Sequence, residues 1–171
     1  MSSEIHRLRA CRFLAAGKEA EANREIDSAL SAWPANINVA VTLVPELERR
    51  GHKKEADTLF KRCLEPHEKT CRDYPRCAES HNSAAWLSAC CRRNLDKALE
   101  HAQKAVELSP HSATYFDTLA EIYFQRGNTG KAIDAVKHAI ELEPKKSYYR
   151  KQLKRLEAGD PSAERPSEDE K

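Results

Sequence analysis

Two segments of this chain, NLDKALEHAQKAVELSP at residues 94–110 and NTGKAIDAVKHAIELEP at residues 128–144, repeat one another at a spacing of 34 residues. Identical residues stand at seven matched positions, which are Asn94/Asn128, Lys97/Lys131, Ala98/Ala132, Ala105/Ala139, Glu107/Glu141, Leu108/Leu142 and Pro110/Pro144. Each copy closes on a proline, a residue that cannot continue a helix. A self-similar period of this length is the signature of a repeat architecture built from small helical units.

The second copy and the residues before it extend the pattern. The positions that match W-x2-L-G-x2-Y…A-x3-F…P are Phe116, Leu119, Ala120, Tyr123, Ala132, Val136 and Pro144, with Phe, Ala and Val as like-for-like departures. On these residues the chain resembles a tetratricopeptide repeat (TPR) protein, whose 34-residue unit is a helix–turn–helix. We expect Ala120 and Ala132 to lie where two antiparallel helices approach closely, and Gly127 to adopt a left-handed conformation at the end of the first helix.

Composition agrees with a helical solenoid. The chain has 171 residues, of which 33% are charged and 6% aromatic, and only 5 are glycine. Such a chain suits a thin core shared between neighbouring helices. We therefore predict an all-α fold, a TPR-like right-handed α-solenoid of antiparallel helix pairs that ends in a capping helix.

The periodicity and its helix-ending residues divide the chain into units. We predict one helical repeat domain over residues 1–158, with units at about 3–34, 37–78, 79–110 and 113–144, a capping helix at 147–157 and a disordered acidic tail at 159–171. Asn36 is the expected cap of the helix at 38–50. Residues 53–64 continue to about Asp73 in a long helix kinked at Pro66, whereas Pro45 should kink or divide its own helix.

The third unit has an ambiguous register. Counting back from Ala98 places Trp86 at the small-residue position, where a Trp side chain cannot fit between two closely packed helices. We therefore assign Ala85 to that position, with one extra residue in the following turn. The string N-S-A-A-W-L at residues 82–87 then resembles an N-x-x-A-W-L variant found in bacterial TPR proteins.

Charge is uneven along the chain. The tail at 159–171 has five acids and two bases, which give −3 and leave +5 for residues 1–158 out of the net +2. This total does not favour nucleic acid as a partner. The first residues have neither a signal peptide nor a membrane-spanning apolar run, so we expect a cytoplasmic protein that has no membrane partner. This expectation is the same whether the sequence is a whole protein or a piece of a longer chain.

The resemblance implies a groove lined by the first helix of each unit, where TPR proteins bind a peptide or a helix of a partner. The positions that correspond to this groove are Asn82, Trp86, Asp117, Glu121, Phe124, Tyr148, Lys151 and Arg155. Aromatic and charged side chains together are typical of protein interfaces. The alternative is that Asp117 and Glu121 pair with Lys151 and Arg155 across the helix contact. Two acids would in either case repel the C-terminal carboxylate that some TPR domains bind.

A metal site is the alternative from another class. His67 and Cys71, and likewise Cys77 and His81, are pairs of zinc-type ligands four residues apart. Their spacing matches no known zinc finger, and the six cysteines contain no CxxC pair. The five glycines are isolated turn residues and form no phosphate-binding loop, so we expect neither a cofactor nor an enzyme.

The sequence thus predicts a non-catalytic protein–protein interaction module, a scaffold or adaptor with another protein as its partner. The alternatives are a zinc- or thiol-based metal or redox sensor and a structural segment of a larger multi-repeat assembly. The identity of the partner and the oligomeric state do not follow from the sequence.

Overall fold

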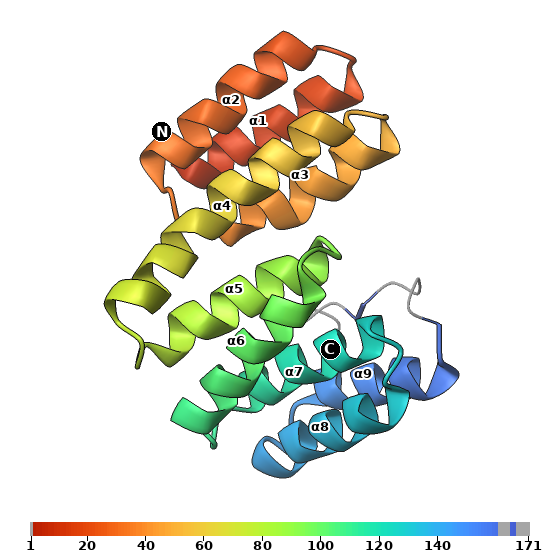
Figure 1. Cartoon of the computed structure of the whole chain (residues 1–171). Helices are drawn as coiled ribbons and strands as arrows, with labels where there is room; N and C mark the ends of the chain where they lie inside the picture. Colours follow the sequence, from red (N-terminus) through yellow and green to blue (C-terminus); the bar gives the residue numbers. More distant parts are fainter. Residues whose placement is uncertain (1, 161–164, 167–171) are drawn as a thin grey trace. The chain divides into compact units, whose positions relative to one another are not determined.

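The computed structural model describes residues 2–160 and 165–166. It divides the chain into two compact units, Met1–Asp73 and Tyr74–Lys171. The described residues are helical apart from short connections, which confirms the all-α class (Figure 1). The single repeat domain inferred from the sequence stays a prediction, and so does the disordered tail, most of which lies outside the described residues.

The first unit is built from two helix pairs. Its helices are α1 (Ser3–Ala15), α2 (Glu19–Ala32), α3 (Ile37–Arg49) and α4 (Lys53–Asp73). The predicted cap is confirmed, because the side chain of Asn36 accepts a hydrogen bond from the backbone N–H of Asn38 at 3.1 Å. Asn36 also donates to Ser3 Oγ at 2.9 Å, so one residue ties the start of α3 to the start of α1.

Two prolines lie inside helices of the first unit. Pro66 lies within α4, which runs unbroken to Asp73 as predicted. Pro45 lies within α3, which stays one helix from Ile37 to Arg49 and is not divided. Burial explains why α3 tolerates the loss of the backbone hydrogen bond that Pro45 cannot donate. Its apolar stripe is almost fully buried and consists of Val39, Ala40, Leu43, Val44 and Leu47. Burial of each valine or leucine of the stripe contributes roughly 1.5–3 kcal/mol.

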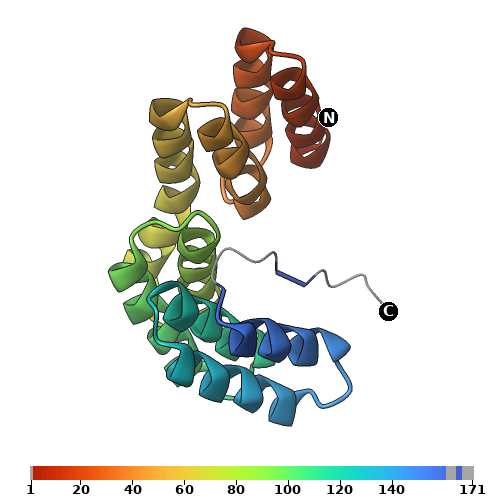
Figure 2. The same ribbon diagram turned by 90° about the vertical axis from the view of Figure 1, so that its right-hand side faces the viewer.

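The second unit contains two more helix pairs and a last single helix. These are α5 (Ala78–Cys90), α6 (Leu95–Leu108), α7 (Ala113–Gln125), α8 (Thr129–Leu142) and α9 (Ser147–Ala158). Figure 2 shows α7, α8 and α9 stacked side by side. The final helix covers the end of the unit's core with Tyr149 and Leu156, which are 1% and 0% exposed. It has the position of a capping helix.

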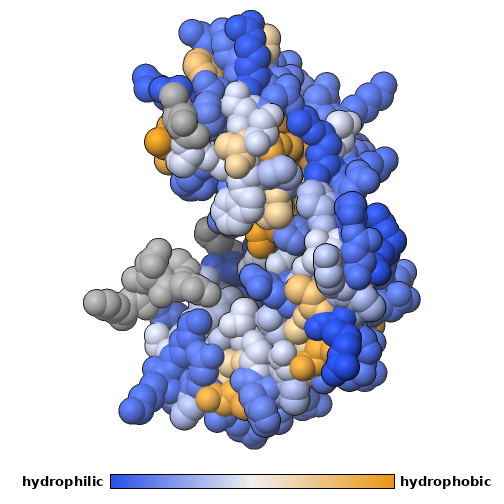
Figure 3. Space-filling model, turned by 90° about the vertical axis from the view of Figure 1, so that its left-hand side faces the viewer, coloured by the Kyte–Doolittle hydropathy of each residue, from blue (hydrophilic) through white to orange (hydrophobic). Residues whose placement is uncertain are grey.

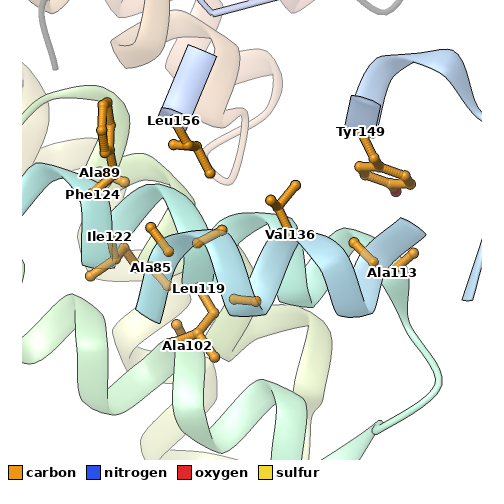
Figure 4. Close-up of a cluster of buried hydrophobic side chains, with 14 of the residues drawn as sticks. Ala85, Ala89, Ala102, Ala113, Leu119, Ile122, Phe124, Val136, Tyr149 and Leu156 are labelled. Atoms are coloured by element: carbon orange, nitrogen blue, oxygen red, sulfur yellow. The ribbon is translucent and has the colours of Figure 1, made fainter. Parts of the chain in front are cut away.

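Small residues form the close helix contacts of the second unit, as the repeat pattern predicts. Ala85, Ala120 and Ala132 are each 0% exposed and belong to one buried cluster. Figure 4 shows members of this cluster from several helices, with Ala102 beside Leu119. Alanine at these positions lets the backbones approach, and the larger side chains fill the space around them.

The register assigned to the third unit agrees with the structure. Ala85 is fully buried, whereas the neighbouring Trp86 is only half-buried. The connection between α5 and α6 has four residues, one more than the connection between α7 and α8. The longer connection needs two non-glycine residues with positive φ, Arg92 at 51° and Asn94 at 52°. In the shorter connection Gly127 takes the predicted left-handed conformation, at φ 76°.

The exposed surface is mostly polar. Figure 3 shows one face on which hydrophobic residues form only small, separate areas. Among the described residues the large hydrophobic side chains that are exposed are Ile5, Leu8, Trp33 and Tyr74. Within that same set of residues, no helix is both long enough and apolar enough to span a bilayer.

Candidate protein-interaction face

The residues predicted to line a groove all lie on α5, α7 and α9 of the second unit. We call this surface the A-helix face; its predicted residues are Asn82 and Trp86 on α5, Asp117, Glu121 and Phe124 on α7, and Tyr148, Lys151 and Arg155 on α9. Each helix contributes residues three, four or seven positions apart, a spacing that keeps them on one side of the helix. The structure thus brings together, in one unit, positions that are up to 73 residues apart in the sequence.

A buried hydrogen bond joins α7 to α9 at one end of this face. Tyr148 Oη donates to Asp117 Oδ2 at 3.0 Å, and the two residues are 7% and 5% exposed. Burial raises the pKa of the Tyr148 hydroxyl, and the charge and hydrogen bond of Asp117 raise it further. Tyr148 therefore stays protonated and remains a donor. Asp117 thus holds α9 through the hydroxyl of Tyr148.

A second polar group joins the same two helices one turn further along. Arg155 donates to Glu121 from Nη1 at 2.8 Å and from Nη2 at 3.1 Å. Gln152 and Gln125 donate to the same carboxylate at 3.2 Å and 2.8 Å. The Arg155 guanidinium also lies 5.0 Å from the ring centre of Phe124. The pairing of Glu121 with Arg155 is the one that the sequence offered as an alternative to partner binding.

The Glu121–Arg155 pair is buried rather than at the surface. Its side chains are only 2% and 6% exposed. Burial alone would raise the pKa of Glu121, but the hydrogen bonds from Arg155 and Gln125 and the positive charges of Arg155 and Arg165 outweigh it and lower the pKa. Glu121 is therefore a carboxylate at neutral pH. Its hydrogen bonds with Arg155 hold α9 on α7.

The α5 part of the face remains more accessible. Asn82 and Trp86 are half-buried, and so is Lys151 on α9. The Asn82 side-chain oxygen is buried and has no hydrogen-bond partner among the residues that the structure describes. The half-buried Cys90 stands one turn further along α5 from Trp86. These side chains are the ones that a binding partner could contact without taking the α7–α9 packing apart.

Two further residues on this face were not among the residues predicted for the groove. Arg165 lies over the Trp86 ring, with 4.4 Å between the guanidinium carbon and the ring centre. Cys90 accepts a hydrogen bond from Arg165 Nη1 at 2.8 Å. Arg165 belongs to the stretch predicted to be a disordered acidic tail, and no periodicity links it to α5. An arginine directly before a proline was the one local feature that set it apart.

The residues of the alternative metal site are divided between the two units. In the first unit, His67 Nε2 lies 3.2 Å from the carbonyl oxygen of Ala35, and Cys71 is buried. In the second unit, Cys77 Sγ donates to Ser80 Oγ at 3.3 Å. A four-ligand site would need ligands from both units, and it stays a prediction.

His81 has two partners of its own within the second unit. Its Nδ1 atom lies 2.8 Å from Nδ1 of His101, and its Nε2 atom lies 3.2 Å from the carbonyl oxygen of Pro75. Because two imidazole nitrogens can share only one proton, one ring donates to the other.

The family model of the tetratricopeptide repeat matches residues 113–146, the α7–α8 pair with its flanking turns. The chain has the tetratricopeptide repeat fold. No curated protein has a sequence that matches it.

Solved structures support the TPR fold over most of the chain. A thermophilic TPR protein of Thermus thermophilus is 18% identical, with a TM-score of 0.54 over 91% of this chain and 81% of that one. MamA from Desulfovibrio magneticus RS-1, residues 41 to the end, is 18% identical with a TM-score of 0.50, over 91% and 84%. A mutant O-GlcNAc transferase of Thermobaculum terrenum is 21% identical with a TM-score of 0.53.

The match to the transferase covers 70% of this chain but only 22% of that one. At these identities each likeness is one of fold alone. TPR repeats in general are protein–protein interaction modules and are generally non-catalytic. The bacterial N-x-x-A-W-L type stays a prediction.

Proposed function

We propose that this chain is a non-catalytic scaffold or adaptor that binds a peptide or helical segment of another protein on the A-helix face of its second unit. The observation that carries the proposal is the state of Trp86. This large aromatic residue stands on the face, half-buried, in a position where the close helix contact is already made by Ala85. A rigid aromatic side chain that the core does not need is typical of an interface hot spot.

The polar side chains of α7 support the face from within. Asp117 and Glu121 are 5% and 2% exposed and bond to Tyr148 and Arg155 of α9. The Glu121–Arg155 and Asp117–Tyr148 bonds hold the underlying helices in place, so the surface is preformed. Preorganisation lowers the entropic cost of binding a flexible segment. The cytoplasmic location predicted from the sequence is part of this proposal.

The test is affinity capture from an extract of the source organism with the wild-type chain, Trp86→Ala and Trp33→Ala as three baits. Trp33 is the matched control, because it is the other tryptophan of the chain and is 55% exposed in the first unit. We expect a partner that is held by the wild type and by Trp33→Ala and is lost from Trp86→Ala. Far-UV circular dichroism checks that each bait is folded.

Two results would contradict the proposal. A partner held equally by all three baits would place binding on another surface. Absence of any partner, for a bait that is a stable monomer, would favour the structural-segment alternative. Charge reversal at Asp117 or Glu121 is unsuitable for this purpose, because both residues are buried and would take α9 off the unit if they were replaced by lysine.

A further inference from the structure

Arg165 makes two contacts with α5 that resemble those of a bound ligand. Its guanidinium carbon lies 4.4 Å from the ring centre of Trp86, and its Nη1 atom donates to Cys90 Sγ at 2.8 Å. Trp86 and Cys90 are four residues apart and share one side of the helix. Arg165 is 75 residues away from Cys90 in the sequence, so this contact is set by the tertiary structure and not by local sequence.

The surroundings of Arg165 suit a guanidinium in particular. A tryptophan face attracts a cation, and a planar guanidinium can also stack on it. Burial raises the pKa of Cys90 to about 11, although the neighbouring Arg165 charge acts to lower it. The sulfur is therefore a neutral thiol at pH 7 and can accept an N–H without the pair becoming an ion pair. The negative charge of Glu121 also acts on Arg165 from the next helix.

Arg165 stands directly before Pro166. Residues 165–166 belong to no helix or strand. A residue before proline is biased away from the helical region toward extended conformations. An extended segment makes few internal contacts and presents its side chains one at a time, as short peptides do on binding proteins.

We propose that Trp86 and Cys90, with Glu121 behind them, form a recognition site for an arginine side chain in an extended segment of a partner protein. Arg165 of this chain occupies the site as an internal competitor. This inference rests on the proposed function and names the chemistry of the segment that the A-helix face binds. Because Arg165 is tethered six residues beyond Gly159, its effective concentration at the site is on the order of millimolar. A partner must displace it.

The contact made by Arg165 can be measured in the full chain. In a Trp33→Phe background Trp86 is the sole tryptophan, and acrylamide quenching of its fluorescence reports how well its ring is covered. We expect quenching to increase in Arg165→Ala and to increase less in Arg165→Lys, which keeps the charge but not the planar group. Lys171→Ala, which removes the other cation of the tail, should match the parent. Equal quenching of the parent and Arg165→Ala would overturn the contact.

Recognition of a separate segment needs a probe of known composition. A fluorescent peptide with the sequence DPSAERPSEDEK, residues 160–171 of this chain, serves as that probe in an anisotropy titration. The full chain carrying Arg165→Ala should bind it about 10-fold more tightly than the wild type, because the internal competitor is gone. Adding Trp86→Ala should weaken that binding by about 3- to 30-fold.

A peptide with alanine in place of its arginine separates an arginine site from general adhesion. It should bind Arg165→Ala at least about 3-fold more weakly than the arginine peptide. Equal binding of the two peptides, or no binding of either, would overturn the arginine site. Neither result would touch the proposed function, since that is decided by the captured partner's dependence on Trp86.

Discussion

The buried pair of Glu121 and Arg155 should control whether α9 stays on the second unit. In Glu121→Ala, the guanidinium of Arg155 loses both of its bonds to the carboxylate, made at 2.8 and 3.1 Å, while it remains only 8% exposed. Gln125 and Gln152 lose an acceptor at the same time. Removing one partner of a buried ion pair costs about 3–5 kcal/mol. We expect the free energy of unfolding of the second unit to fall by that amount.

The double variant Glu121→Leu with Arg155→Met tests whether the loss of stability comes from the buried charge that Glu121→Ala leaves on Arg155. It removes both charges and leaves apolar side chains of similar size, an exchange that is often close to neutral. We expect it to cost less than either single variant, with a coupling energy of about 2–4 kcal/mol in the double-mutant cycle. Additive effects, or a cost below about 1 kcal/mol for Glu121→Ala, would refute the reasoning, because the pair would then behave as an exposed one.

Urea unfolding followed by Trp86 fluorescence in a Trp33→Phe background measures this energy in the unit that contains the pair. A probe inside one unit is needed because a chain with two units need not unfold in one step. The matched control is Glu107→Ala on α6. Glu107 pairs with Lys104 at 2.9 Å, but those side chains are 67% and 40% exposed. Its removal should change the stability by less than about 0.5 kcal/mol.

Three further predictions concern the same unit. The pKa of Glu121 is lower in the folded chain than its ordinary 4.5, so its contribution to the free energy of unfolding is fully present above pH 4.5 and is lost as the pH falls through the folded pKa. Urea midpoints measured from pH 7 to 3 should therefore fall more steeply for the wild type than for Glu121→Gln. Ala120→Leu inserts three carbons into a contact that is 0% exposed and should cost about 1–3 kcal/mol, whereas Leu at the exposed Ala158 should change the melting temperature little. Gly127→Ala should cost about 1 kcal/mol in urea unfolding through its left-handed backbone alone, since nothing lies within 4 Å of the added Cβ; a loss several times larger would indicate a packing clash.

The helices could be predicted because their signals are local. Apolar residues three and four apart mark the buried side of each helix, and Gly127 or Pro144 marks where a helix ends. The helix from Lys53 to Asp73 followed from the same reasoning, although it contains Pro66. Pro45 was harder, because the sequence shows the hydrogen bond that a proline removes but not the tertiary packing that compensates for it.

The sequence predicted where the site residues lie, but not which of them are buried and paired with one another. The repeat pattern placed Asp117, Glu121 and Arg155 on one face, since residues at fixed offsets in equivalent helices face the same way. It could not show that Glu121 and Arg155 would be buried against each other, because burial depends on how closely α9 approaches α7. Long-range geometry of that kind decides whether a charge is a binding group or a structural one.

The sequence by itself determined that this chain is a helical repeat and which alanines lie in the close contacts of the second unit. Each of these follows from a period of 34 residues and from the size of a methyl group, and both are properties of short stretches of chain. Only the tertiary structure decided that Tyr148 bonds to Asp117 and that Arg165 stacks on Trp86. Such pairs depend on distances between atoms that are tens of residues apart, and those distances are set by the packing of the whole unit.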